Sequence, residues 1–167
     1  VICTYNRANM LKDTLISFLE SIRIDIGHEL LVIDNNSTDH TREVVMSLAE
    51  KDPTIKYCFE AKQGLSEARN SGINASTGYI IAFVDDDVWF DKYWLVQLLD
   101  IFDRNQNASC VGGCVMPKFE CERPDWLDDD LLWIYGVTCY GDEEKTITPP
   151  DIPIGCNMAF RRDVFEK

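Results

Sequence analysis

Three consecutive aspartates, Asp85, Asp86 and Asp87, directly follow the apolar run at residues 79–84. Alternate residues of an extended chain point the same way, so we expect Asp85 and Asp87 to face one site while Asp86 faces away. Two carboxylates at one place repel each other unless a cation lies beside them. Mg²⁺ or Mn²⁺ fits, because these ions commonly take one or two carboxylates together with substrate phosphates. The alternative is a solvated acidic turn that leads into the next helix.

Other polar residues also follow predicted strands, and in open parallel sheets ligands bind beyond the carboxyl ends of the strands. Thr4, Tyr5 and Arg7 follow the first apolar run, and Asp34 ends the second. Two interpretations of Asp34 stay open. It either closes an Asx-type turn with the residues after it or accepts hydrogen bonds from a base or a ribose.

Arg69 and the later aromatic residues each have a structural and a functional interpretation. Arg69 precedes the acidic strand on a predicted helix, where it is either a solvated residue or a forked donor to a nucleotide. Four aromatic residues lie among acidic residues and prolines: Trp126, Trp133, Tyr135 and Tyr140. They fit core packing, stacking on a sugar face or contact with a membrane interface.

The elements that must position these residues alternate along the first 116 residues. Apolar runs predict strands at residues 1–5, 29–34, 55–59, 79–84 and 111–116, and helical periodicity predicts helices at 9–22, 37–50, 65–75 and 91–104. Ser37 or Thr38 is the expected cap of the second helix. This order predicts an α/β fold with a doubly wound, mostly parallel sheet and helices on both faces. From Pro117 to residue 152 the pattern is irregular, as in functional or mobile loops, and residues 152–160 return to a strand-like run.

Length and charge narrow the classes of function. The chain has 167 residues, enough for one domain, and 29 acidic against 16 basic residues give a net charge of −13. Such a surface disfavours nucleic acid and anionic lipid, although a divalent cation can still bridge it to an anionic nucleotide. No apolar run approaches the roughly 18 residues of a membrane span. Since the chain starts on Val1 rather than Met, we expect it to be a fragment cut at both ends.

Seven cysteines are present, an odd number, and several lie inside apolar runs: Cys3, Cys58, Cys110, Cys114, Cys121, Cys139 and Cys156. Their spacing does not fit a zinc site, and the chain has only two histidines to complete one. We therefore expect reduced, mostly buried thiols and a cytoplasmic location.

Taken in order, these motifs resemble one known family. Residues 1–7 (VICTYNR), 32–39 (VIDNNSTD), 64–72 (GLSEARNSG) and 83–87 (FVDDD) are similar to the family 2 glycosyltransferases of the GT-A fold. Residues 155–162 (GCNMAFRR) look like the strand that follows in that family. Any one motif is weak evidence, but four in order are strong.

The resemblance implies a metal-dependent, inverting transfer of a sugar from a nucleoside-diphosphate donor, with UDP-sugars favoured, in polysaccharide or cell-surface glycan synthesis. By similarity, the nucleotide-sugar site would comprise Thr4, Tyr5, Arg7, Asp34, Arg69, Asp85 and Asp86, with Asp87 and Asp85 holding Mn²⁺ or Mg²⁺. The domain would span residues 1–167, with the donor part at 1–116 and the start of the acceptor-side part at 117–167. The resemblance also implies a glycan or lipid-linked acceptor, and the expected location is the cytoplasm, including the inner face of the membrane.

One element of the family pattern is missing, because members usually carry a later Glu-Asp pair whose aspartate is the general base. We expect that base after Lys167. A donor-binding but inactive module is therefore an alternative. A sugar nucleotidyltransferase is another, although residues 6–9 lack the glycine-rich loop that holds triphosphate. A phospho-acceptor receiver domain would carry its acidic pair after the first strand, which this chain does not.

Overall fold

The structure is a computed structural model that describes residues 1–22, 27–138, 143–148 and 152–166. The strands are β1 (Ile2–Thr4), β2 (Leu30–Asp34), β3 (Ile55–Phe59), β4 (Ile80–Phe83), β5 (Cys110–Gly112) and β6 (Met158–Arg161). The helices are α1 (Ala8–Glu20), α2 (Thr41–Ala49), α3 (Leu65–Ala75) and α4 (Trp94–Arg104), with two 3-10 helices, η1 (Asp129–Tyr135) and η2 (Arg162–Phe165).

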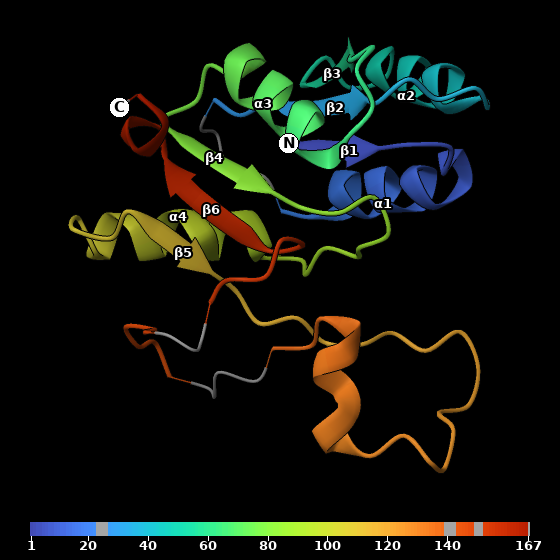
Figure 1. The fold of residues 1–167 in the computed structure, drawn as a ribbon. Helices are drawn as coiled ribbons and strands as arrows, with labels where there is room; N and C mark the ends of the chain where they lie inside the picture. Colours follow the sequence, from blue (N-terminus) through green and yellow to red (C-terminus); the bar gives the residue numbers. More distant parts are fainter. Residues whose placement is uncertain (23–26, 139–142, 149–151, 167) are drawn as a thin grey trace.

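The strands form two three-stranded sheets that meet between β1 and β4 (Figure 1). β1, β2 and β3 are parallel, in the order β1-β2-β3. A parallel bridge between Ile2 and Val84 links β1 to the end of β4. There the Val1 nitrogen donates to the Ala82 carbonyl at 2.7 Å and the Val84 nitrogen donates to the Val1 carbonyl at 3.2 Å. The first four strands are therefore parallel, and the chain reverses its direction of winding between β1 and β4.

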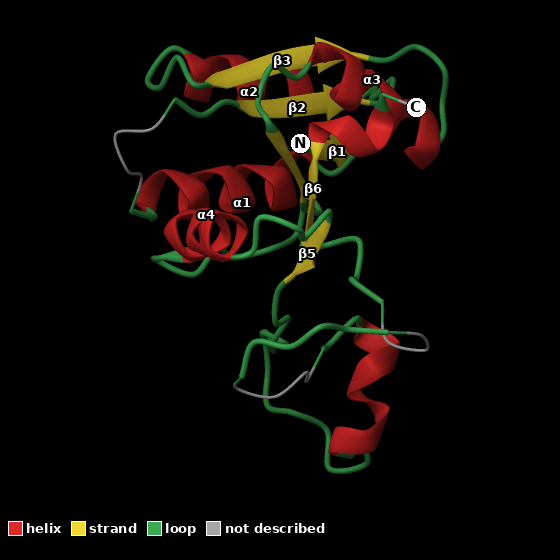
Figure 2. Cartoon of the chain, turned by 90° about the vertical axis from the view of Figure 1, so that its left-hand side faces the viewer, coloured by secondary structure: helices red, strands yellow, loops and turns green. Residues whose placement is uncertain are grey.

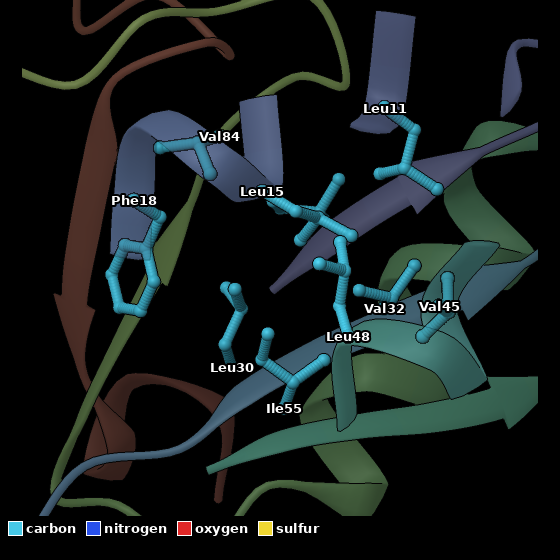
Figure 3. Packing of buried hydrophobic residues seen from close by; sticks show 10 residues of the cluster. Leu11, Leu15, Phe18, Leu30, Val32, Val45, Leu48, Ile55 and Val84 are labelled. Atoms are coloured by element: carbon cyan, nitrogen blue, oxygen red, sulfur yellow. The ribbon is translucent and has the colours of Figure 1, made fainter. Parts of the chain in front are cut away.

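Helices cover both faces of the parallel strands, because alternate strand residues point to opposite faces. All five residues of β2 are buried. Leu30 and Val32 pack against α1 and α2, whereas Leu31 and Ile33 pack on the α3 side. Figure 3 shows the larger cluster, with Leu11, Leu15 and Phe18 of α1 spaced to project from one face of the helix. Figure 2 shows α1 and α4 on one side of the sheet and α3 on the other. The predicted doubly wound fold is confirmed.

The last strand departs from the parallel arrangement of the first four. β6 runs antiparallel between β4 and β5, and it covers only the end of the strand-like run expected at residues 152–160. Ala159 of β6 is 1% exposed beneath Leu98 and Phe102 of α4. β5 is also shorter than expected, at Cys110–Gly112 rather than residues 111–116.

Several other element boundaries also differ from the prediction, among them the starts of the second helix, the fourth helix and the fourth strand. The second helix starts at Thr41, and the side chain that binds its first turn is Asp39 rather than Ser37 or Thr38. The Asp39 Oδ1 atom accepts bonds from the Thr41 nitrogen at 3.0 Å and the Thr41 Oγ1 at 2.5 Å. Tyr79, expected in the fourth strand, precedes it and is 91% exposed.

Residues 115–138 leave the sheet after β5 and form a separate lobe that contains η1 (Figures 1 and 2). Leu127, Leu132 and Val137 make a small apolar cluster of their own. The lobe is tied back at Thr138, which pairs with Val115 and whose Oγ1 accepts from the Val115 nitrogen at 2.9 Å. Within the described residues, no helix is long and apolar enough to cross a membrane.

Candidate functional site

A cavity of about 450 Å³ opens at the carboxyl edge of the sheet, where β1 and β4 meet. This is the topological switch point, at which ligands bind in open α/β sheets. The cavity is lined by Cys3, Thr4, Tyr5 and Arg7 after β1, by Asn35 after β2, by Gln63, Gly64, Leu65 and Ala68 at the start of α3, and by Asp85, Asp86 and Asp87 after β4.

Asp86 is the most firmly held of the three aspartates, and it is only 4% exposed. Its Oδ2 accepts a bond from Thr4 Oγ1 at 2.7 Å and its Oδ1 accepts from Arg7 Nη1 at 2.8 Å. Its backbone carbonyl accepts from Thr14 Oγ1 at 3.0 Å. Burial raises the pKa of Asp86, against the lowering effect of the Thr4 bond and the Arg7 charge.

The expectation that Asp86 faces away from the site is wrong, because all three aspartates line the cavity. The expectation assumed an extended chain, but residues 86–87 form a turn directly after the strand. A two-residue alternation does not apply there.

Arg7 is the residue that precedes α1, and its side chain reaches the acidic cluster. Its guanidinium bridges two aspartates, with Nη1 on Asp86 at 2.8 Å and Nη2 on Asp87 at 2.7 Å. Asp85, the third aspartate, is half-buried. Burial and the charge of Asp87 raise its pKa, and the Arg69 and Arg7 charges lower it. The cluster therefore concentrates negative charge that one arginine only partly compensates.

Asp34 closes an Asx-type turn, which is the first of the two interpretations that its sequence position left open. It is 3% exposed, its Oδ1 accepts from the Ser37 nitrogen at 2.9 Å, and its Oδ2 accepts from the Tyr57 hydroxyl at 2.8 Å. Burial and this bond to Asp34 raise the pKa of Tyr57 to about 12. Asp34 does not line the cavity, although its neighbour Asn35 does.

Arg69 likewise lies behind the cavity rather than in its lining. Its guanidinium packs over the Phe83 ring, 5.8 Å from the centroid, and a Cβ added to Gly155 would lie 2.7 Å from Arg69 Nη2. Gly155 therefore leaves room for the guanidinium beside β4. The guanidinium charge is close enough to Asp85 to lower the pKa of that carboxyl.

This chain matches Glycosyl transferase family 2 along residues 1–167. It belongs to that family. Its relatives include the glucosyl-dolichyl phosphate glucuronosyltransferase of Haloferax volcanii, 28% identical over 99% of this chain and 52% of that protein. The chain thus spans about half the length of the curated relatives it matches.

Two solved structures share the fold. The Pyrobaculum calidifontis mannosyltransferase PcManGT, in complex with GDP-Man and Mn²⁺, has a TM-score of 0.69 at 24% identity, over 99% of this chain and 44% of that one. S. aureus TarS in complex with UDP-GlcNAc has a TM-score of 0.65 at 17% identity, over 99% and 45%. The expected GT-A fold is therefore confirmed for this glycosyltransferase domain.

The acidic cluster of this family 2 domain fits a divalent cation only in part. Among the described residues, no three His, Cys, Asp or Glu side chains come together closely enough to hold a metal ion. Carboxylate oxygens are nevertheless the ligands that Mg²⁺ and Mn²⁺ prefer, and such ions often keep only one or two of them beside phosphates and water. The Arg7 guanidinium already places a positive group against Asp87. The donor set therefore fits a cation that completes its coordination with a diphosphate.

Two asparagines that the sequence motifs do not identify as site residues hold the loops at the binding edge of the glycosyltransferase domain. Asn35 donates from Nδ2 to the Lys62 carbonyl at 2.7 Å and accepts from the Gly64 nitrogen at 2.7 Å, which fixes the loop before α3. Asn6, at φ 53°, accepts from the Thr38 nitrogen at 2.7 Å and joins the loops after β1 and β2. The available signal was their position, since both directly follow predicted strands at the binding edge.

Of the aromatic residues in the lobe, Trp126 and Trp133 are 67% and 70% exposed. The interpretation that they pack in a core is therefore wrong for both tryptophans, and Tyr135 is exposed as well. Tyr140 lies outside the described residues. The lobe approaches the donor side through Lys118, whose Nζ lies 3.0 Å from the centroid of the Trp89 ring.

Proposed function

We propose that this domain binds a nucleoside-diphosphate sugar through a divalent cation and transfers the sugar, with inversion, to a glycan or lipid-linked acceptor. UDP-sugars are the first donors to test. The single observation that carries the proposal is the cavity at the switch point, where three aspartates and Arg7 meet. Family membership supports the sugar transfer, and the geometry supports the donor class.

The donor would lie along the carboxyl edge of the sheet. Tyr5, 48% exposed at the cavity, offers a ring face and a hydroxyl to the base. Thr4 and Asp86 would form the wall of the cavity beneath the nucleotide, and Asp85 would face the ribose and the sugar. Asp34 accepts a hydrogen bond from Tyr57 and does not line the cavity. It would therefore act on the base of the nucleotide indirectly, by positioning the next residue, Asn35, which does line the cavity.

Asp87 and Asp85 would hold Mn²⁺ or Mg²⁺, which when bound supplies Lewis-acid stabilisation to the departing diphosphate. Arg7 would donate to the diphosphate, and Arg69 would add positive charge from behind Asp85. Mn²⁺ in the PcManGT complex supports this choice of ion.

The acceptor would enter from the lobe side. Exposed Trp126 and Trp133 present the flat apolar faces that sugars stack on. Inversion by one displacement requires a base that deprotonates the acceptor hydroxyl, which we place after Lys167. Without such a base, the domain would bind donor and transfer no sugar, so the full reading frame separates the two alternatives.

The dolichyl phosphate in the name of the Haloferax relative supports a lipid-linked acceptor. We propose a role in polysaccharide or surface-glycan synthesis. The reaction would take place in the cytoplasm or at the inner face of the membrane, where nucleotide sugars are supplied.

Calorimetry with UDP and with GDP, each with Mn²⁺ and then with a chelator, tests the donor site. We expect the chelator to abolish most of the affinity. Asp87→Ala should weaken Mn²⁺-dependent binding by about 100-fold, since even outer-shell partners of metal ligands are worth 10–100-fold. Asp100→Ala, which removes an exposed carboxylate from α4, is the matched control and should bind normally. Equal affinity with Mn²⁺ and with chelator would exclude the metal-bridged site.

A further inference from the structure

The contact of Arg7 with Asp87 occupies one of the two carboxylate oxygens through which Asp87 could bind the proposed cation. Arg7 Nη2 lies 2.7 Å from Asp87 Oδ2. A guanidinium and a divalent cation at one carboxylate repel each other, and the guanidinium takes up one of the two oxygens through which a cation can bind. The Arg7 contact therefore competes with the metal for Asp87, and metal binding is favoured when that contact opens.

The two halves of the Arg7 bridge are unequal. The Asp86 side chain is 6% exposed and the Asp87 side chain is 46% exposed. Asp86 is also fixed by Thr4, whereas no hydrogen bond to Asp87 other than that from Arg7 is found among the described residues. An ion pair in water is weak, and a buried one with further hydrogen bonds holds its geometry. The contact with Asp86 is therefore the anchor, and the contact with Asp87 is the one that opens.

Opening that contact leaves Arg7 Nη2 close to the cavity with one other hydrogen-bond partner in the described part of the chain, the Met10 sulfur at 3.0 Å. A thioether is a weak acceptor, whereas a diphosphate oxygen is a strong one for a guanidinium. The residue stays in place because Nη1 keeps its bond to Asp86.

We propose that Arg7 is a positioning residue that couples donor binding to metal binding. Before ligand binds, it holds Asp87. When the diphosphate accepts Nη2, Asp87 is released to the cation. Each ligand thereby removes the obstacle to the other, and by thermodynamic linkage the effect is equal in both directions. This inference rests on the proposed donor site for the identity of the diphosphate, but its metal half concerns only Arg7 and Asp87.

The test measures Mn²⁺ affinity without nucleotide by the paramagnetic resonance signal of the free ion, and then UDP affinity with Mn²⁺ by calorimetry. Arg7→Met should bind Mn²⁺ alone about 3-fold or more tightly, because a competing ion pair is lost. The same variant should bind UDP with Mn²⁺ about 10-fold or more weakly, because a charged hydrogen bond is lost. If Arg7 had only a structural role, Arg7→Met would weaken both the binding of Mn²⁺ alone and the binding of UDP with Mn²⁺.

Arg69→Met is the matched control, because it removes the same charge near Asp85 without touching Asp87. It should change the Mn²⁺ affinity less than Arg7→Met does. An equal rise in both variants, or no rise in Arg7→Met, would overturn the exchange. Arg7→Lys keeps the charge but cannot span two carboxylates, so a smaller shift in the same direction is expected and serves if Arg7→Met does not fold.

The outcomes separate the two proposals. Absence of Mn²⁺-dependent binding of both UDP and GDP in the unaltered chain would refute the proposed function, whereas the Mn²⁺ comparison would still decide the role of Arg7. Normal UDP binding without the opposite shifts in Arg7→Met would refute the coupling alone.

Discussion

The donor edge of the sheet and the lobe at residues 115–138 are built in opposite ways. At the donor edge, polar side chains are buried and held by partners far along the chain, as Asp86 is by Thr4. In the lobe, large aromatic side chains are exposed and the apolar cluster has three buried residues. The contrast indicates that one region is preorganised, while the other has little internal packing to hold a single conformation.

Core truncations should separate the two regions most clearly. Leu15→Ala removes a fully buried side chain from the main cluster and should lower the free energy of unfolding by about 3 kcal/mol. Leu132→Ala, in the lobe cluster, should cost clearly less in global unfolding, because the sheet can stay folded when the lobe opens. Urea titrations followed by circular dichroism give both values. Equal losses would show that the lobe and the sheet unfold as one unit.

Hydrogen exchange measures the same contrast without mutation. Amides of Ile80–Phe83 should exchange much more slowly than those of the lobe, because the strand lies inside the sheet. UDP with Mn²⁺ should slow exchange in the lobe if donor binding closes it over the site. Protection of the lobe equal to that of β4 in both states would make it structural packing rather than an acceptor-side element.

Glu29 should make the stability of the sheet region change with pH in the acid range. Burial alone would raise its pKa, but bonds from Lys56 and Thr77 outweigh burial and lower the pKa to about 2. A carboxylate whose pKa is lower in the folded state stabilises that state at pH values above its unfolded pKa of 4.5. This stabilisation is lost as the pH falls towards the folded-state pKa of about 2.

Glu29→Gln should therefore destabilise the domain at neutral pH, by about 1 kcal/mol after solvent screening. The difference should shrink towards zero near pH 2, which unfolding titrations across the acid range can follow. A difference that stays constant with pH would contradict the assignment.

The cysteines give the smallest and most local test. Among the described residues no two cysteines form a disulfide, but the expectation that the cysteines are mostly buried is wrong, because four of them are half-buried and Cys114 and Cys121 are exposed. Cys139 lies outside the described residues. Burial raises the pKa of Cys3 to about 11 and also raises that of Cys58, Cys110 and Cys156. Alkylation of the native protein should therefore label Cys121 and Cys114 first, as mass spectrometry would detect. Early labelling of Cys3 would mean that the sheet opens.

Local patterns predicted the elements of the first half well, since the third helix has the expected bounds of residues 65–75. Periodicity reports which face of an element is apolar, but it does not report which strands pair. The place of β6 between β4 and β5 therefore could not be predicted.

The same limit applies to the candidate site. The sequence indicated that Asp85, Asp86 and Asp87 lie together, because they are adjacent in the chain. It did not indicate that Arg7, 79 residues before Asp86, bridges two of them. Long-range partners are set by packing of the whole sheet, which a local window does not contain.

The position of β6 has a consequence for synthesis on the ribosome. β4 and β5 each pair with β6 along their length, yet β6 is the last strand of this chain to emerge. Until it does, both strands present unpaired backbone groups, and exposed strand edges promote association between chains. Nascent chains whose emerged part ends before residue 158 should therefore aggregate more readily than those in which residue 161 has emerged.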